Sequence, residues 1–375
     1  MISPLSHRFV QAKWGGFHLK DLFEIKSSIK RFDANKVTVF ERGHHPYIIR
    51  SGSNNGQRGY LKENEKFLNE GNTISFGQDT ATLFYQQKPY FTGDKIKILK
   101  STLQQFGQKE ALFFISSLNK AFSNFSWGSS RFNVKTIGNQ IFNLPVREDN
   151  QIDFDFINSF MRQLEIEFLE VLKNYLAASG APDFCFTKEE TLAIESLKAK
   201  KFKNFKVTEI FNIKNTSNLL SRDIKENSGS IPYLCASAEN NGVSGFISYD
   251  DPSFLNKGNC VFIGGKTFVV SYQEKDFFSN DSHNLALYLK EKKYSHKDIL
   301  LGLATCINLS LRHKYSWGNS ISLQKIKHDF VTLPLENGQP DFELLGNLTS
   351  ALKKLVLKTV DDFVTYNLKV TKNDR

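Results

Sequence analysis

Hydrogen-bonding side chains gather in two loops of closely similar sequence. Residues 46–59 read PYIIRSGSNNGQRG, and residues 232–245 read PYLCASAENNGVSG. The first loop offers arginine, amide and hydroxyl groups, and the second offers amide, hydroxyl and carboxylate groups. These groups donate and accept directional hydrogen bonds, so they suit recognition of a polar ligand. The apolar residues that open each loop predict a strand, and Asn-Gly predicts a tight turn after it.

Motifs that mark common catalytic sites are missing. Residues 264–267, GGKT, look like the end of a phosphate-binding loop, but Cys260 stands where the motif needs its first glycine. No HExxH, GxSxG or Asn-Pro-Pro-Tyr motif occurs. The four cysteines are far apart and form no CxxC pair, which fits buried thiols in a reducing compartment. We therefore expect a binding protein with no active site, metal or cofactor of its own.

The charge balance favours a polyanionic partner, although many basic proteins bind no nucleic acid. The 375 residues include 49 lysines and arginines against 39 acidic residues, a net charge of +10. No apolar run reaches ~18 residues, so no membrane-spanning helix is expected. The first residues lack the apolar core of a secretion signal. The sequence therefore predicts a cytoplasmic protein that works without a membrane.

The two loops belong to a long internal repeat. FLNEGN at 67–72 returns as FLNKGN at 254–259, and SWG at 126–128 returns at 316–318. The offset drifts only from 186 to 190 residues along the copy. A repeat of this size lies well above the periods of ~20–50 residues that mark solenoids, so it indicates two copies of one domain.

Each copy predicts the same series of elements. A β-hairpin is expected in each, at 71–85 and 258–272, with its tip at 77–80 or 264–267. Apolar spacing also predicts strands at 95–99 and 284–289 and helices at 109–121 and 297–309. Trp127 and Trp317 stand in the SWG segments, and we expect both in the core rather than at a ligand surface.

A long amphipathic helix is predicted after each copy, at 152–176 and 341–368. Asp153 and Asp341 stand at their starts, where a carboxylate caps a helix. Apolar residues follow heptad-like steps, at Ile157, Phe160, Leu164, Phe168, Val171 and Tyr175 and at Leu345, Leu348, Leu352, Leu355, Thr359 and Phe363. We expect these stripes to pack on each other in an antiparallel coiled coil. The alternative is that each helix folds back on its own domain.

This layout resembles the DNA specificity (S) subunits of Type I restriction–modification systems and the related Type IIB subunits. The resemblance rests on DLFEIK at 21–26, PYIIRSGSNNGQRGY at 46–60, the run from Phe67 to Ile96, and LPV followed by IDFDFINSFMRQLE at 152–165. It implies an α/β fold with two target recognition domains, each reading half of a split site in double-stranded DNA. It also implies that the helices form a spacer and recruit methyltransferase subunits, and that this subunit is not catalytic.

The resemblance assigns catalysis and S-adenosylmethionine to partner subunits, either a methyltransferase with a restriction subunit or a fused nuclease–methyltransferase. On the helices we expect partner-binding residues at Phe160, Leu164, Phe168, Leu348, Leu352 and Leu355. The domains are expected at 1–148 and 203–338, and the spacer regions at 149–202 and 339–375. A helix of 25 residues (152–176) is about 37 Å long, close to one turn of DNA, so the helices would set the gap between half-sites.

Comparison of the copies separates scaffold positions from reading positions. Asn54 and Asn55 return as Asn240 and Asn241, and we expect them to satisfy turn backbone. Positions that differ in the same frame are expected to read bases, and nearby lysines to hold phosphates. The predicted DNA-binding residues are Arg50, Ser53, Gln57, Arg58, Gln78, Asp79, Lys95, Ser129, Arg131, Glu239, Ser244, Lys266, Lys314 and Asn319. The alternatives are a nonspecific nucleic-acid-binding protein, a fragment with hidden enzymatic activity, and a duplicated carbohydrate-binding or scaffold module.

Overall fold

Short strands separated by turn residues build separate small sheets in two units of the chain. The computed structural model describes residues 4–123, 133–178 and 184–373. Residues 1–172 with 366–375 form one unit, and residues 173–365 form the other. Among the described residues, no helix is long and apolar enough to span a membrane.

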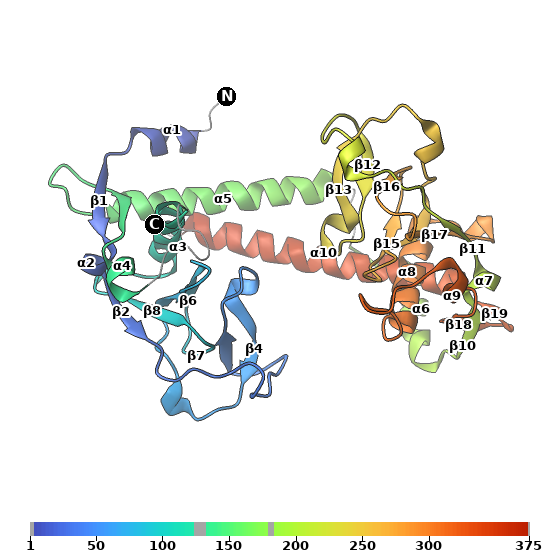
Figure 1. Ribbon diagram of the computed structural model, residues 1–375, viewed down its shortest axis with the longest axis horizontal. Helices are drawn as coiled ribbons and strands as arrows, with labels where there is room; N and C mark the ends of the chain where they lie inside the picture. The colour runs from blue at the N-terminus through green and yellow to red at the C-terminus, as the bar shows by residue number, and fades with distance from the viewer. Residues whose placement is uncertain (1–3, 124–132, 179–183, 374–375) are drawn as a thin grey trace. The chain divides into compact units, whose positions relative to one another are not determined.

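The first unit contains a four-stranded sheet, a three-stranded sheet and a strand pair (Figure 1). Its strands are β1 (Trp14–His18), β2 (Phe23–Ser27), β3 (His45–Ile48), β4 (Gln57–Leu61), β5 (Thr73–Gly77), β6 (Leu83–Gln86), β7 (Phe91–Thr92), β8 (Ile96–Ser101) and β9 (Ile141–Pro145). Its helices are α1 (Pro4–Gln11), α2 (Leu19–Leu22), α3 (Gln108–Phe122), α4 (Val134–Gly138) and most of α5 (Phe154–Ala178). The sheet orders are β2-β8-β5-β6, β4-β3-β7 and β1-β9.

The second unit repeats these sheets in the same order, as β11-β17-β14-β15, β13-β12-β16 and β10-β18, with β19 added beside β18. Its strands are β10 (Phe202–Lys206), β11 (Phe211–Asn215), β12 (Ile231–Leu234), β13 (Val243–Ile247), β14 (Cys260–Ile263), β15 (Val270–Gln273), β16 (Phe278–Ser279), β17 (Leu285–Leu289), β18 (Phe330–Glu336) and β19 (Gln339–Pro340). Its helices are α6 (Lys188–Ser196), α7 (Val207–Ile210), α8 (Lys297–Leu311), α9 (Leu323–Ile326) and most of α10 (Phe342–Asn373). The predicted duplication and both predicted hairpins, β5–β6 and β14–β15, are confirmed.

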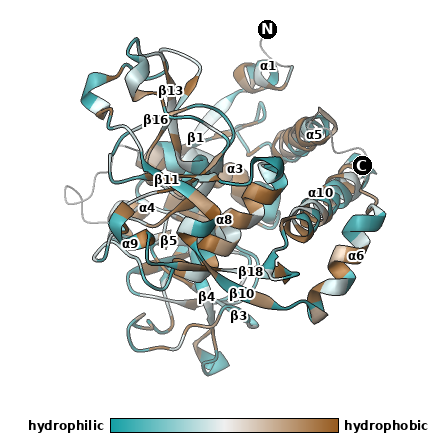
Figure 2. Cartoon of the chain, turned by 90° about the vertical axis from the view of Figure 1, so that its right-hand side faces the viewer, coloured by the Kyte–Doolittle hydropathy of each residue, from teal (hydrophilic) through white to brown (hydrophobic). Residues whose placement is uncertain are grey.

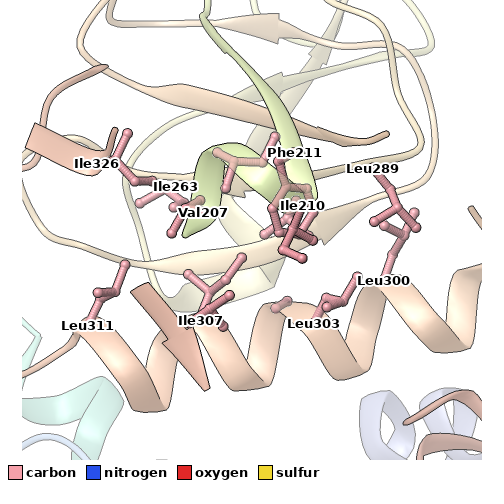
Figure 3. Packing of buried hydrophobic residues seen from close by; sticks show 14 of the residues in the cluster. Val207, Ile210, Phe211, Ile263, Leu289, Leu300, Leu303, Ile307, Leu311 and Ile326 are labelled. Atoms are coloured by element: carbon pink, nitrogen blue, oxygen red, sulfur yellow. The ribbon is translucent and has the colours of Figure 1, made fainter. Parts of the chain in front are cut away.

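One amphipathic helix closes the core of each unit. In the second unit, Leu300, Leu303, Ile307 and Leu311 occur at steps of three or four along α8 and are fully buried. Figure 3 shows them facing residues of α7, β11, β14 and β17. Burying a leucine or isoleucine side chain stabilises a fold by roughly 1.5–3 kcal/mol, so this stripe fixes the helix on the sheet. Helix α3 has the same role in the first unit.

The long helices begin as predicted. Asp153 Oδ1 accepts a hydrogen bond from Phe156 N at 2.9 Å, and Asp341 Oδ1 accepts one from Leu344 N at 2.9 Å. Both carboxylates therefore cap their helices. The first turns pack on their own units, because Phe160 contacts Phe113 and Phe342 contacts Tyr294.

Farther along, the two long helices pair. In the first unit, Lys372 Nζ of α10 lies 2.7 Å from Glu170 Oε1 of α5, and Leu169, Leu368 and Thr371 are buried beside this ion pair. Helix α5 runs out of the first unit and α10 runs back into it, so the pair is antiparallel, as predicted.

The buried seam of the pair is not the predicted one. Only the first two residues of each predicted stripe are buried or half-buried, namely Ile157 and Phe160 on α5 and Leu345 and Leu348 on α10. The rest is exposed, at Leu164, Phe168, Val171, Tyr175, Leu352, Leu355 and Phe363. Each helix carries a second apolar stripe one position away, through Leu169 and Leu176 on α5 and through Val364 and Leu368 on α10, and this one is buried. Figure 2 shows apolar residues interspersed with polar ones along both helices.

Two short helices, α6 and α1, complete the two units. Thr187 caps the start of α6, and Glu190 N donates to its Oγ1 at 3.2 Å. The Glu190 carboxylate also accepts from Ser350 and Lys354 of α10, at 2.6 and 2.8 Å. Helix α1 precedes β1 in the first unit. Its Phe9 packs against Trp14.

Candidate nucleic-acid interface

The two asparagines of each loop hold the loop backbone. Asn54 and Asn55 both adopt positive φ, near 50°. Their amide nitrogens donate to Gln57 O at 2.8 Å and Tyr85 O at 3.1 Å. Asn240 and Asn241 do the same, donating to Val243 O and Tyr272 O at 2.9 Å. Asparagine tolerates this backbone region and bonds locally, so the predicted structural role is confirmed.

The two loops held by these asparagines expose several of the predicted DNA-binding residues to solvent. Arg58 on β4 is exposed and has no hydrogen-bond or ion-pair partner among the described residues. Glu239 is exposed as well. Ser53 is exposed but bonds to Ser51 Oγ at 3.0 Å, and Ser244 donates to Tyr233 O at 3.1 Å. Arg58 is therefore the side chain of this group that is most available for a ligand.

In the first unit, an ion cluster connects this loop to the hairpin tip. Asp79 at the tip accepts from Arg50, and Lys95 Nζ lies 2.8 Å from the same carboxylate oxygen. Three predicted DNA-binding residues therefore meet at one point. Arg50 also lines an open hollow with Tyr47 and Asp94.

In the second unit, a lysine takes the place of the aspartate at the hairpin tip. Lys266 takes the tip position of Asp79, and its Nζ lies 3.0 Å from Asp281. Burial raises the pKa of Asp281, but hydrogen bonds from His283 and Lys266 outweigh it and lower that pKa to about 2. Ala236 stands in place of Arg50. The frame is the same, but the charged groups it presents are different.

A third segment reaches the hairpin tip of the second unit. Ile321 N donates to Gly265 O at 3.1 Å, so the end of segment 314–321 joins the hairpin tip that carries Lys266. Lys314, predicted to hold phosphate, pairs with Asp329, whose side chain is almost fully buried. Asn319 donates to Lys314 O at 2.7 Å and so braces the segment. Among the predicted residues of the first copy, Ser129 and Arg131 lie outside the described residues.

Trp317 was expected in the core, and this prediction is wrong because 77% of its surface is exposed. It stands in a two-residue turn, since Ser316 and Asn319 exchange backbone hydrogen bonds of 3.2 and 2.9 Å. A turn this short cannot cover an indole with its own residues. The polar neighbours of SWG were the sequence signal for an exposed turn. Trp127, also expected in the core, lies outside the described residues.

The predicted partner-binding residues lie on the long helices. Leu164, Phe168, Leu352 and Leu355 are exposed, whereas Phe160 and Leu348 are half-buried. In the first unit, Leu164 and Phe168 line an apolar groove with Met161 of α5 and Leu112 of α3. Apolar exposure of this extent on one face is typical of a surface that another protein covers.

The described residues contain no cluster of three or more His, Cys, Asp or Glu side chains that could hold a metal ion. Burial raises the pKa of the buried Cys260 thiol and of the half-buried Cys306 thiol, because it disfavours the thiolate, so neither is an activated nucleophile. Each copy of the α/β domain carries a polar loop and is followed along the chain by a long helix. This arrangement is that of a tandem recognition protein.

Comparison with known proteins identifies the family. Residues 11–174 and 199–360 both match the model of the Type I restriction modification DNA specificity domain, and the chain belongs to this family. It is 28% identical over 352 residues to the "Type II restriction enzyme BgcI specificity subunit S.BcgI" of Heyndrickxia coagulans, across 92% of this chain and 96% of that protein. The predicted resemblance is confirmed.

The fold also matches a solved relative. The Type-I restriction-modification S subunit from M. genitalium aligns with a TM-score of 0.50 at 16% identity, over 96% of this chain and 94% of that one. At this identity the likeness concerns the fold alone, and it includes both copies and both long helices.

Proposed function

We propose that this chain is the non-catalytic, sequence-specific DNA-binding subunit of a restriction–modification complex and works in the cytoplasm on double-stranded DNA. Each unit reads one half of a bipartite site. One observation carries the proposal: equivalent positions of the two copies share the same backbone fold but carry different charged groups. Arg50 and Asp79 of the first copy correspond to Ala236 and Lys266 of the second. Copies that bound one common ligand would have no physical reason to differ there.

The exposed helix stripes support a second part of the proposal. Methyltransferase subunits, with a restriction subunit or as a fused nuclease–methyltransferase, cover the apolar residues around Leu164 and Phe168 and the stripe of α10. These partners bind S-adenosylmethionine and modify the DNA.

Methylation mapping tests both parts together. The chain is co-expressed with a methyltransferase subunit encoded beside it, and methylated adenines are located across the host genome. Two short specified ends with a fixed gap are expected. A single unbroken motif would contradict two reading units. Methylation without any motif would favour the nonspecific alternative.

Arg58→Ala tests the reading surface at one residue. An arginine that forms two hydrogen bonds to a guanine contributes about 1–3 kcal/mol of discrimination. We therefore expect about tenfold weaker binding of the cognate duplex by the whole complex and relaxed preference at one base of one half-site. The measurement is a competition assay with duplexes substituted at each position. Equal losses on every duplex would indicate a phosphate contact instead.

A further inference from the structure

Trp317 is a large exposed residue that the proposed function leaves unexplained. Single exposed apolar side chains are common in proteins, so its exposure alone carries no argument. Its setting is more specific. The neighbouring Tyr315 ring packs inward at 5.4 Å from the Phe268 ring, whereas no aromatic ring among the described residues packs against Trp317.

The turn that carries Trp317 is held rigidly. Asn319 Nδ2 donates to Lys314 O at 2.7 Å, and Lys325 Nζ donates to Asn319 Oδ1 at 2.8 Å and to Ser320 O at 2.7 Å. At its base, Lys314 and Tyr315 both bond the buried carboxylate of Asp329. A braced turn loses little conformational freedom when it binds, so Trp317 is presented in a pre-organised position.

The location of the turn indicates what it meets. Ile321 N bonds to Gly265 O, next to Lys266 at the hairpin tip. The indole therefore stands on the segment that adjoins the proposed reading surface of the second unit. The apolar stripe proposed to bind methyltransferase belongs to other elements, α5 and α10.

The repeat supplies an independent observation. Both copies keep Ser-Trp-Gly, although two of the next three residues change, from Ser-Ser-Arg to Asn-Ser-Ile. Other residues that both copies keep have roles inside the protein, such as the asparagines that hold the loop backbone. Trp317 is exposed, and a Cβ on Gly318 would meet nothing within 4 Å, at a φ outside the left-handed range. Neither Trp317 nor Gly318 is kept for packing or for backbone conformation, so we attribute their retention to a contact outside the chain.

We propose that Trp317 inserts its indole between base pairs of the DNA beside the second half-site, as a sequence-independent aromatic wedge. This inference rests on the proposed function. Apolar side chains inserted at a base step partly unstack and kink the duplex. The absent side chain at Gly318 leaves room for the DNA backbone to approach. A sequence that both copies keep suits a contact that does not read bases, whereas the charged hairpin tips differ.

The test uses the full chain in complex with its methyltransferase subunit and a cognate duplex. Because an aromatic side chain stacked on a base stabilises the complex, Trp317→Ala should weaken binding about tenfold or more. Trp317→Phe keeps a ring and should recover most of the affinity. Both variants should unfold at the temperature of the wild type, because the side chain is exposed.

Two readouts separate a wedge from other roles. The base analogue 2-aminopurine, placed at each step of the second half-site in turn, should brighten at one step with the wild type and with Trp317→Phe, but not with Trp317→Ala. A photoreactive benzoylphenylalanine at position 317 should cross-link to DNA. Cross-linking to the methyltransferase subunit, or unchanged affinity and fluorescence with Trp317→Ala, would overturn the wedge. Failure of the wild-type complex to select a bipartite duplex would instead refute the proposed function.

Discussion

Asp79 shows how one side chain positions its neighbours in the proposed reading surface. It is the shared partner of Arg50 and Lys95, and Lys266 replaces it in the second copy. A carboxylate held between two cations neutralises part of their charge and fixes their positions. In the first unit the cations are therefore oriented, and in the second the hairpin tip itself is cationic.

Asp79→Asn keeps the size of the side chain but removes its charge. We expect Arg50 and Lys95 to be released toward phosphates, so that nonspecific affinity rises and discrimination at the first half-site falls several-fold. The second half-site should be read as before. Binding of duplexes with one altered half-site measures this. Glu70→Gln is the matched control, since it removes a 2.5 Å exposed pair with Lys100 in the same unit. Equal effects of both variants would contradict a role for Asp79.

Asn241→Ala tests the structural role of the paired asparagines. Alanine at φ 54° costs roughly 1–2 kcal/mol, and loss of the bond to Tyr272 O adds about 1 kcal/mol. We therefore expect the denaturation midpoint of the second unit to fall. Asn241→Gly should remove the backbone cost, because glycine tolerates positive φ, but should still lose the hydrogen bond to Tyr272 O. Asn337→Ala is the control, because Asn337 has φ 47° but its side chain makes no hydrogen bond within the part of the chain that the structure describes. A loss no larger than that of Asn337→Ala would show that the bond is unimportant.

At single positions, the sequence predicted roles that depend on neighbours in the chain. The asparagine turns were predictable, because their partners include the next few residues and because Asn-Gly favours positive φ. The surroundings of Lys95, Lys266 and Lys314 were not, since their carboxylate partners come from other segments. Whether these lysines also contact phosphate stays a prediction.

At the scale of elements, periodicity predicted the helices but not the buried face. Both long helices carry two apolar stripes at heptad-like spacing, and spacing alone does not tell which stripe meets the other helix. The buried stripe is recognisable only from the structure, at Leu169 and Leu368. The hairpins were easier to predict, because the glycine-containing tips and the aligned copies fixed their centres independently.

Two adjacent residues of α5 separate the stripes experimentally. Leu169 is 3% exposed and Phe168 is 66% exposed. Leu169→Ala should destabilise the chain by about 2–5 kcal/mol, because it leaves a cavity in the helix pair. Phe168→Ala should leave stability nearly unchanged but weaken co-purification of the methyltransferase subunit. Thermal unfolding and affinity pull-down of both variants provide the comparison. Unchanged pull-down with Phe168→Ala would assign the partner surface to other residues.

At the scale of the whole molecule, duplication puts two proposed recognition units on one chain, and the chain leaves the first unit along α5 and returns to it along α10. Because the chain crosses on both helices, neither can change length alone without breaking their pairing. We therefore expect the helix pair to set the gap in the recognised DNA, and the two units to set its specified ends.

Insertion of one heptad into both long helices tests this division. Seven residues lengthen a helix by about 10.5 Å, and base pairs stack about 3.4 Å apart, so the gap between half-sites should grow by about three base pairs. The two specified ends should not change. A heptad keeps the seam through Leu169 and Leu368 in register, whereas three or four residues would rotate it. The same insertion in one helix is the control and should abolish selective methylation. An unchanged gap with both helices lengthened would mean that the helices do not set the spacing.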